Sequence, residues 1–163
     1  MSPRAAWRLE SLGFEQVYDY VAGKQDWGAF GLSLEGRLTE VGYAGDLART
    51  DVPTCRLDHR LGDVRERARA AGWELAIVVN DEEIVLGRVG RKALREASSD
   101  ARVEEVMSSG PGTIRPNTDL ERIVQRLQER GLTSVVVTRS DGRLVGVLRR
   151  EDAERRLAER GAS

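Results

Sequence analysis

Two cationic segments and one carboxylate are the residues best suited to chemistry in this sequence. The cationic side chains are Arg88, Arg91, Lys92 and Arg95 in the first segment and Arg149 and Arg150 in the second. Guanidinium and ammonium groups bind phosphate through charge-assisted hydrogen bonds. Asp152 follows the second segment in the expected first turn of a helix, where the helix dipole by itself favours an acidic residue. These residues therefore indicate either an anion-binding site or ordinary solvated surface charge.

The sequence contains none of the common catalytic motifs. It has no P-loop and no GxGxxG, CxxC, HExxH or GxSxG pattern. The one histidine, His59, and the one cysteine, Cys55, cannot form a protein metal site alone. A Cys55–His59 dyad would lie at a strand-to-helix junction, and no third group is present to orient it. We therefore expect a protein that is not an enzyme.

The elements that carry the two cationic segments occur twice, 59 positions apart. The matching pairs include Gly72 and Gly131, Val78 and Val137, Gly87 and Gly146, and Arg91 and Arg150. Each copy is predicted to run strand, helix, strand, strand, helix. A constant spacing without insertion indicates two copies of one supersecondary unit, so the two cationic segments occupy equivalent places.

The second copy has the clearest local signals. Its helix carries an apolar stripe of helical period at Leu120, Ile123, Val124 and Leu127. Thr118 and Glu121 form an S/T-x-x-E capping box at the start of this helix. Gly131 ends it at the position where left-handed backbone geometry is common. Two apolar strands are predicted to follow, at residues 135–137 and 144–148.

This ordered set resembles the cystathionine β-synthase (CBS) motif. The features that match are a T-h-x-P strand at 113–116, a helix ending at Gly131, two apolar strands and a G-h-h-x-x-x-D ending at 146–152. Two such motifs in tandem resemble a CBS pair, or Bateman module. The resemblance implies an α+β fold of two β-α-β-β-α repeats with pseudo-twofold symmetry, at residues 51–97 and 103–161. It also implies a homodimer formed through the helices of the repeats.

The resemblance further implies a non-catalytic regulatory module that requires no cofactor. Such pairs commonly bind AMP, ADP, ATP or S-adenosylmethionine between their motifs and transmit occupancy to a partner, which the sequence leaves unknown. Asp152 matches the family's ribose acceptor, and Arg149, which replaces a hydroxyl residue, would reach a phosphate. The ligand-binding residues implied for this cleft are Asp152, Arg149, Val147, Gly146, Thr54, Cys55, His59, Glu74, Leu75 and Ala76.

The first motif departs from the family pattern, because Gly90 and Ala93 replace its hydroxyl residue and its Asp. We therefore expect a second cleft that is weak or empty for nucleosides. The residues implied for it are Thr113, Ile114, Thr133, Ser134, Arg91 and Lys92. Twofold symmetry would bring the two cationic segments together as a polyphosphate site. We expect Trp73 to be a core residue rather than a stacking platform, and His59 to be a solvated or capping residue.

About the first 36 residues resemble the C-terminal tail of rhodanese-like sulfurtransferase domains. The matching features are a helix, an LGF sequence, a strand at 17–21, a GGK-like turn and Trp27. In that family the catalytic Cys precedes the matching helix, whereas here only Met1 and Ser2 do. We therefore expect residues 1–40 to be a non-catalytic remnant that packs on the main module, followed by a linker at 37–51.

The composition favours a globular protein that is free in solution. Of its 163 residues, 40% are hydrophobic and 33% are charged, with a net charge of -1. A charge near zero gives no pull toward nucleic acid or anionic membrane. One cysteine excludes an internal disulfide and fits a reducing compartment. With no apparent signal peptide or membrane-spanning run, we expect a cytoplasmic protein with neither nucleic-acid nor membrane partners.

Three alternatives remain open on the sequence alone. The main one is a structural or protein-interaction module with degenerate nucleotide sites, which the departures at Ala93 and Arg149 favour. A sulfurtransferase would require turnover that depends on Cys55. Nucleic-acid binding is the weakest, because the net charge offers no general attraction to phosphate backbones.

Overall fold

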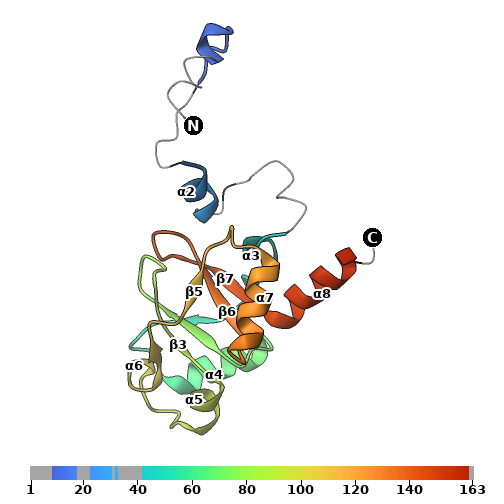
Figure 1. The fold of residues 1–163 in the computed structure, drawn as a ribbon. Helices are drawn as coiled ribbons and strands as arrows, with labels where there is room; N and C mark the ends of the chain where they lie inside the picture. The colour runs from blue at the N-terminus through green and yellow to red at the C-terminus, as the bar shows by residue number, and fades with distance from the viewer. Residues whose placement is uncertain (1–8, 18–22, 31, 33–41, 162–163) are drawn as a thin grey trace.

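The computed structural model describes residues 9–17, 23–30, 32 and 42–161. Within these ranges the chain forms two small mixed sheets that lie side by side, with helices on their outer sides (Figure 1). One sheet has the strand order β1-β2-β3-β4 and the other has the order β5-β6-β7. The α+β class expected from the sequence is confirmed.

The first repeat forms the larger sheet and its two flanking helices. It consists of β1 (Thr54–Cys55), α4 (Leu61–Ala70), β2 (Ala76–Val79), β3 (Val85–Val89) and α5 (Arg91–Glu96). β1 is parallel to β2, because α4 returns the chain to the same end of the sheet, and β3 is antiparallel to β2. Leu61, Val64 and Ala68 are buried along one face of α4, as their helical spacing requires.

The second repeat has the same order of elements. It consists of β5 (Thr113–Ile114), α7 (Leu120–Glu129), β6 (Ser134–Thr138), β7 (Leu144–Arg149) and α8 (Arg150–Gly161). The registers repeat with the 59-residue spacing, because Val78 pairs with Gly87 and Val137 pairs with Gly146. Each sheet also has an irregularity directly after this pair. The predicted duplication is therefore present in the backbone as well as in the sequence.

The predicted start of α7 is wrong by one residue. Asp119, not Thr118, is the N-cap, and its carboxylate accepts a hydrogen bond from the backbone N–H of Arg122. The Thr118 hydroxyl instead donates to the carbonyl of Arg115, 2.7 Å away, and closes the turn before the helix. Both Asp and Thr cap helices well, so the local turn decides between them.

Two short segments cross from one repeat to the other, and we call them the crossing segments. The first, residues 43–50, contains α3 (Ala44–Leu47) and precedes the first repeat, but Arg49 exchanges two backbone hydrogen bonds with Val147 of the second. The second, residues 102–109, contains α6 (Val103–Val106) and β4 (Ser108–Ser109), and β4 pairs with β3 of the first repeat. Each repeat is thus completed by the segment that leads into the other.

This exchange corrects the expectation of a linker at residues 37–51. Residues 37–41 lie outside the described part of the chain, whereas residues 42–51 form α3 and the Arg49 pairing. Gly45, taken as a sign of a loop, allows a close approach: a Cβ there would lie 2.9 Å from Cβ of Pro116. The segment is therefore a packed element of the fold.

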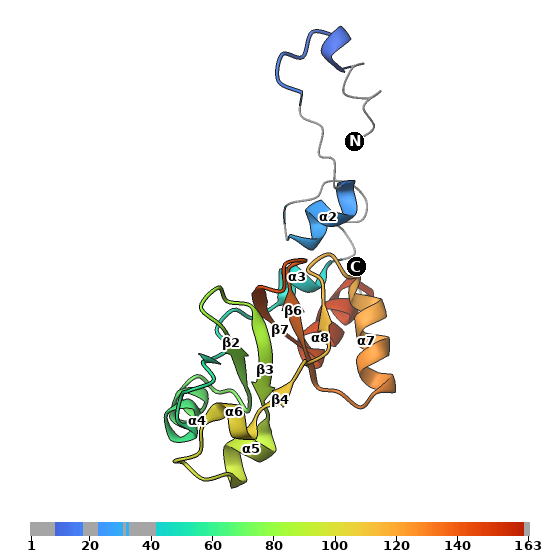
Figure 2. The same cartoon turned by 90° about the vertical axis from the view of Figure 1, so that its left-hand side faces the viewer.

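Three clusters of buried apolar side chains hold the structure together. One lies under α7 and α8, and a second lies under α4 and α5. The third is shared by the two repeats, because Trp73, Ile77 and Val79 of the first pack with Val136 and Val147 of the second. Figure 2 shows the result, with the two sheets in the middle and the helices of each repeat on opposite sides.

The N-terminal region is described only in part. Residues 9–11 are helical, and α2 (Gly23–Ala29) is a second short helix that contains Trp27. The strand expected at 17–21 falls almost entirely outside the described residues. Gly28 is buried against Asn117, so α2 touches the turn that precedes α7. Among the described residues, none of the helices has the length and apolar content that a membrane-spanning segment requires.

Candidate functional site

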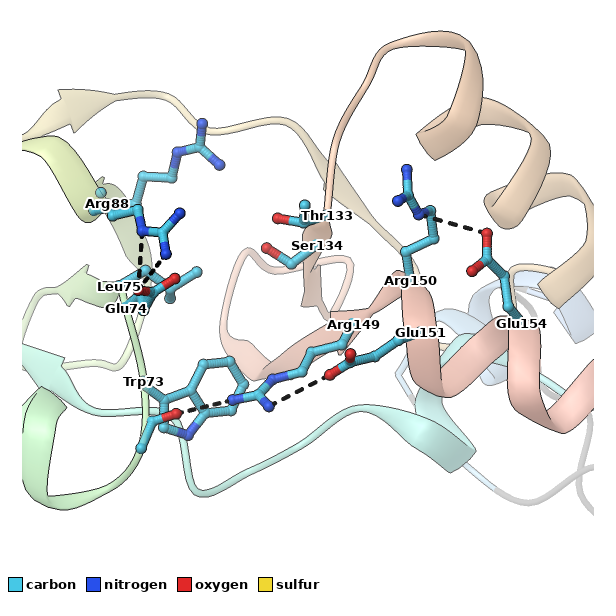
Figure 3. Close-up of a pocket in the computed structure, with 13 residues that line it drawn as sticks. Trp73, Glu74, Leu75, Arg88, Thr133, Ser134, Arg149, Arg150, Glu151 and Glu154 are labelled. Atoms are coloured by element: carbon cyan, nitrogen blue, oxygen red, sulfur yellow. Dashed lines mark hydrogen bonds and ion pairs between the residues drawn. The ribbon is translucent and has the colours of Figure 1, made fainter.

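The strand ends near the pseudo-twofold axis surround a hollow of about 560 Å³, which we call the central cleft (Figure 3). Its lining residues are Gly72, Trp73, Glu74, Leu75, Arg88, Gly90, Arg91, Thr133, Ser134, Arg149, Arg150, Glu151 and Glu154. Cavities that hold small molecules typically measure about 300–1,000 Å³. The cleft is therefore large enough for a nucleotide.

The duplication explains why these residues meet. Glu74 and Thr133 are equivalent positions that precede β2 and β6, and Arg91 and Arg150 are equivalent positions that follow β3 and β7. Because the middle strands of the two sheets face each other, their equivalent ends converge on one hollow. The prediction that symmetry brings the two cationic segments together is confirmed for Arg88, Arg91, Arg149 and Arg150. Lys92 and Arg95, the other two members of the first segment, are not among the lining residues.

Four arginines and three glutamates line the central cleft, and most of them are already paired. Glu74 accepts hydrogen bonds from Arg91, at 2.7 and 2.9 Å, and from Arg95, at 2.9 Å. Arg150 lies 3.5 Å from Glu154 in an ion pair on α8. Arg88 forms no ion pair with any carboxylate in the described part of the chain, and Figure 3 shows its side chain on the wall opposite Arg150. An anion in the cleft would find at least this cation unneutralised.

Arg149 does not extend into the open cleft. Its guanidinium carbon lies 4.1 Å from the centroid of the Trp73 ring, and it donates to the Gly72 carbonyl at 3.3 Å. Arg49 lies over the same ring, at 5.4 Å. Trp73 is only 5% exposed and packs in the shared core cluster, as expected, but part of the cover over its ring consists of two guanidinium groups. We call Arg49, Trp73 and Arg149 the arginine–tryptophan stack.

Asp152 lines a different hollow, of about 610 Å³, which we call the Asp152 hollow. The residues around it are Gly42, Asp46, Leu47, Ala48, Arg49, Leu120, Asp152, Arg155, Arg156 and Glu159. The Asp152 carboxylate is ion-paired with Arg155, three residues along α8. Arg49 belongs both to this hollow and to the arginine–tryptophan stack, whereas Trp73 and Arg149 line the central cleft. The stack therefore forms the wall between the two hollows.

A third hollow of about 390 Å³ contains several residues that were implied for the Asp152 cleft. We call it the His59 hollow, and Thr54, Cys55, His59 and Gly146 are among the residues that line it. His59 Nδ1 accepts from the backbone N–H of Arg56 at 3.3 Å and lies 3.2 Å from a guanidinium nitrogen of Arg67. Cys55 is 2% exposed, and burial raises the pKa of its thiol to about 11.

The residues predicted for one cleft are thus distributed over three hollows. Glu74, Leu75 and Arg149 line the central cleft, together with Thr133 and Ser134 from the predicted second cleft. Three other predicted contacts, Ala76, Ile114 and Val147, line none of the hollows and are buried in the core. Cys55 lines the His59 hollow but is itself only 2% exposed. Thr113 is only partly buried and lines none of the three hollows.

Sequence reasoning missed the contribution of the first crossing segment. Arg49 and Ala48 line the Asp152 hollow, and Thr50 lines the His59 hollow. The available signal was the 59-residue spacing, which aligns residues 43–50 with 102–109 and so predicts a structured element in both places. Within the described chain, no three His, Cys, Asp or Glu side chains are grouped to hold a metal ion.

Comparison with known protein families gives a match over most of the chain. Residues 44–100 and 103–159 each match the model of the CBS domain. No curated protein matches the sequence. The family match begins at the first crossing segment, so the resemblance of residues 1–40 to a rhodanese-like tail gains no support.

Solved structures with the same fold include proteins of several kinds. The cytosolic domain of the Mg2+ channel MgtE in complex with ATP has 24% identity and a TM-score of 0.65 over 70% of this chain and 48% of its own. The CBS domains of a transcriptional regulator from Streptococcus pneumoniae have 22% identity and a TM-score of 0.64, over 69% of this chain and 97% of theirs. CBSX2, a protein of Arabidopsis thaliana, in complex with AMP has 20% identity and a TM-score of 0.64, over 72% and 97%.

At these identities the likeness establishes the fold. The chain spans about half the length of the MgtE structure, 48%, but nearly the whole of the other two. The repeats described above therefore correspond to nearly the whole of two of these solved chains and to about half of the third.

Proposed function

The chain belongs to the CBS domain family, whose pairs are non-catalytic regulatory modules, and we propose that it binds an adenine nucleotide with its phosphates in the central cleft. The observation that carries this proposal is the convergence of Arg88, Arg91 and Arg150 on one hollow. Arg88 has no carboxylate partner among the described residues, and a phosphate there gains charge-assisted hydrogen bonds. The ATP and AMP complexes of structures with this fold support the same class of ligand.

The number of phosphate groups on the nucleotide sets the order of affinity that we expect. Because the cleft offers several guanidinium groups, each additional phosphate gains a contact that AMP lacks. We expect ATP to bind more tightly than ADP, and ADP more tightly than AMP, by about tenfold per phosphate, the equivalent of one charge-assisted hydrogen bond. S-adenosylmethionine, which has no phosphate and carries a positive charge, should bind most weakly.

Asp152 lies on the other side of the arginine–tryptophan stack from the central cleft. We propose that its carboxylate accepts the hydrogen bonds of the ribose hydroxyls. A carboxylate that accepts hydrogen bonds from two ribose hydroxyls distinguishes a nucleotide from its bare phosphate chain. Asp152→Asn should therefore weaken the binding of ATP and leave the affinity for inorganic tripolyphosphate unchanged. The second repeat alone provides this group, because Ala93 stands at the equivalent position in the first.

Isothermal titration calorimetry of the full chain with AMP, ADP, ATP, S-adenosylmethionine and tripolyphosphate tests the proposal. Arg88→Ala and Arg150→Ala should each lower the affinity of the chain for ATP. Arg122→Ala, which removes an exposed arginine from α7 outside all three hollows, is the matched control. A chain that gives no heat and no rise in melting temperature with any nucleotide at millimolar concentration would contradict the proposal and favour a module that acts through protein contacts.

Binding at a cleft between two repeats gives a route for transmitting occupancy. A ligand that touches both repeats favours the arrangement in which its contacts to both are made, and an attached domain or partner that senses this arrangement is regulated. We further propose a homodimer formed through the helices of the repeats, which the resemblance to CBS pairs implies, and a cytoplasmic location, which the free state of the only cysteine favours. Sedimentation equilibrium with and without ATP measures both the assembly and its dependence on ligand.

A further inference from the structure

We propose that the arginine–tryptophan stack is a displaceable partition, and that Trp73 receives the base of the nucleotide once Arg149 has left it. This inference rests on the proposed nucleotide function and assigns Trp73 and Arg149 roles within it. In the structure the stack separates the arginines of the central cleft from Asp152. A nucleotide whose phosphates lie at Arg88 and Arg150 reaches Asp152 only if this wall opens.

The contacts of the two arginines show which one moves. Arg49 is held by the Asp51 carboxylate through two hydrogen bonds, at 3.0 and 2.5 Å, and the same bonds lower the pKa of Asp51. Its backbone is also fixed to Val147. Arg149 has only a 3.3 Å bond to the Gly72 carbonyl and a 3.7 Å ion pair with Glu151. Arg149 lies nearer the ring centroid than Arg49, at 4.1 Å against 5.4 Å, but its polar contacts are the weaker ones, so the ring is the main contact that its guanidinium has to give up.

A phosphate offers Arg149 a better partner than the indole does. A cation over a tryptophan ring gains about 0.5–2 kcal/mol. A bidentate guanidinium–phosphate contact is charge-assisted on both sides and is among the strongest polar contacts in proteins. Arg149 already lines the central cleft, so we expect rotation of its side chain, without a backbone change, to bring the guanidinium from the ring to a phosphate bound there.

The asymmetry of the duplication supports a specific role for the stack. Trp73 comes from the first repeat and Arg149 from the second, and the positions that the 59-residue spacing makes equivalent to them are Leu132 and Gly90. Leu132 and Gly90 cannot form a cation–aromatic contact, so only one of the two symmetry-related sites between the repeats has the partition. Asp152 belongs to this site, whereas Ala93 stands at its place in the other. The base platform, the ribose acceptor and the movable arginine thus belong to one nucleoside position.

Trp73 itself reports the movement. The chain contains three tryptophans, so a variant with Trp7→Phe and Trp27→Phe leaves Trp73 as the only one. Acrylamide quenching of its fluorescence measures how accessible the ring is. Tripolyphosphate should draw Arg149 away and bare the ring, raising the quenching constant by about twofold, whereas ATP should lower the constant because its base covers the ring. Adenosine alone should leave it unchanged.

Arg149→Gln in the same background provides the matched comparison. Without the guanidinium the ring is accessible from the start, so quenching should be high without ligand, should not respond to tripolyphosphate, and should still fall with ATP. Arg122→Gln is the control and should behave as the parent does. If Arg149→Gln does not fold, the titration of the parent with the three ligands decides alone.

Calorimetry on the same samples separates the two proposals. No heat with ATP contradicts the nucleotide function. Heat with ATP but an unchanged quenching constant with both ATP and tripolyphosphate contradicts the partition and leaves the nucleotide function intact. A quenching constant that rises with tripolyphosphate and falls with ATP supports both the nucleotide function and the partition.

Discussion

Ile84 and Arg143, which occupy equivalent positions 59 residues apart, pair with each other where the two repeats meet. The hydrogen bonds around them are reciprocal. The N–H of Val85 donates to the Gly142 carbonyl at 3.1 Å, and the N–H of Leu144, the equivalent of Val85, donates to the Glu83 carbonyl at 3.0 Å. The pseudo-twofold axis therefore passes between Ile84 and Arg143, and the backbone itself joins the repeats at this point.

The same symmetry leads to a prediction about Glu83. Glu83 has φ of 64° and Gly142, its equivalent, has φ of 87°, so both lie in the left-handed region. Side chains with a Cβ are strained there and glycine is not. Glu83→Gly should raise the free energy of unfolding by about 0.5–1 kcal/mol, despite the added flexibility of the unfolded chain. Urea denaturation measures the change.

Glu82→Gly is the matched control, because Glu82 is an exposed neighbour without a positive φ. It should lower the free energy of unfolding slightly, through the unfolded state alone. A Glu83→Gly variant that is no more stable than Glu82→Gly would show that residue 83 carries no strain.

Gly146 should tolerate no side chain, because the first crossing segment passes directly over it. A Cβ at this position would lie 2.5 Å from the Arg49 carbonyl oxygen, which the pairing with Val147 holds in place. Gly146→Ala should reduce the free energy of unfolding by about 1–3 kcal/mol, the usual cost of an overpacked core. Gly90→Ala, where nothing lies within 4 Å of the added methyl group, should cost far less. Equal losses in thermal denaturation would argue against the close approach.

Arg65 should be important for stability although it is far from the central cleft. Its guanidinium donates to the carbonyls of Leu94 and Ala97 and to the hydroxyl of Ser99, and so joins α4 to the end of α5 and to the connection between the repeats. Arg65→Met keeps the apolar stem but leaves these acceptors without their donor, at an expected cost of about 1–3 kcal/mol.

Arg65→Lys should recover little of the stability that Arg65→Met loses, because an ammonium group cannot match the planar geometry that serves three acceptors. Arg69→Ala, at an exposed position on the same helix, is the control. Full recovery by lysine in a melting experiment would mean that charge, rather than geometry, is what Arg65 supplies.

The Cys55 thiol should be inert in the folded protein. Burial raises its pKa from 9.0 to about 11, and the thiolate is the reactive form. Iodoacetamide at pH 8 should not modify the native chain and should modify it fully in urea. Rapid modification of the native protein would contradict this and would reopen the sulfurtransferase alternative, which needs an accessible thiolate.

The same shift gives a dependence of stability on pH. A raised pKa means that the folded chain keeps its thiol proton at a pH at which the unfolded chain has lost it. The contribution of Cys55 to stability is therefore complete below pH 9.0 and is lost as the pH rises toward about 11. Cys55→Ala should remove this part of the alkaline loss in urea denaturation measured from pH 8 to pH 11.

The elements that sequence predicted best are those with strong local periodicity. α7 has its stripe of Leu120, Ile123, Val124 and Leu127 buried as expected, and the strands around Val137 and Gly146 pair in the register that the repeat implies. The crossing segments were only partly anticipated, because helices of four residues and a single bridging residue have no periodicity to detect. Their structure depends on pairing partners far away in the chain.

In the candidate site too, features that follow from the repeat were predictable and features that depend on distant residues were not. The convergence of Arg91 and Arg150 follows from the repeat alone, so it was predictable. The position of Arg149 was not, because its partners Gly72 and Trp73 are more than 75 residues away and no local pattern links them. The separation of Asp152 from Thr54 by the first crossing segment was likewise hidden, since that segment resembled a linker.

The crossing segments have a consequence for how such a molecule originates. One copy of the 59-residue unit has no second copy in its own chain to receive its leading helix, and its β-sheet would keep an open edge. A chain with one copy would complete itself only as a pair of identical subunits, each lending its first residues to the other. Fusion of the two genes would then turn that pair into a single polypeptide without rebuilding any contact.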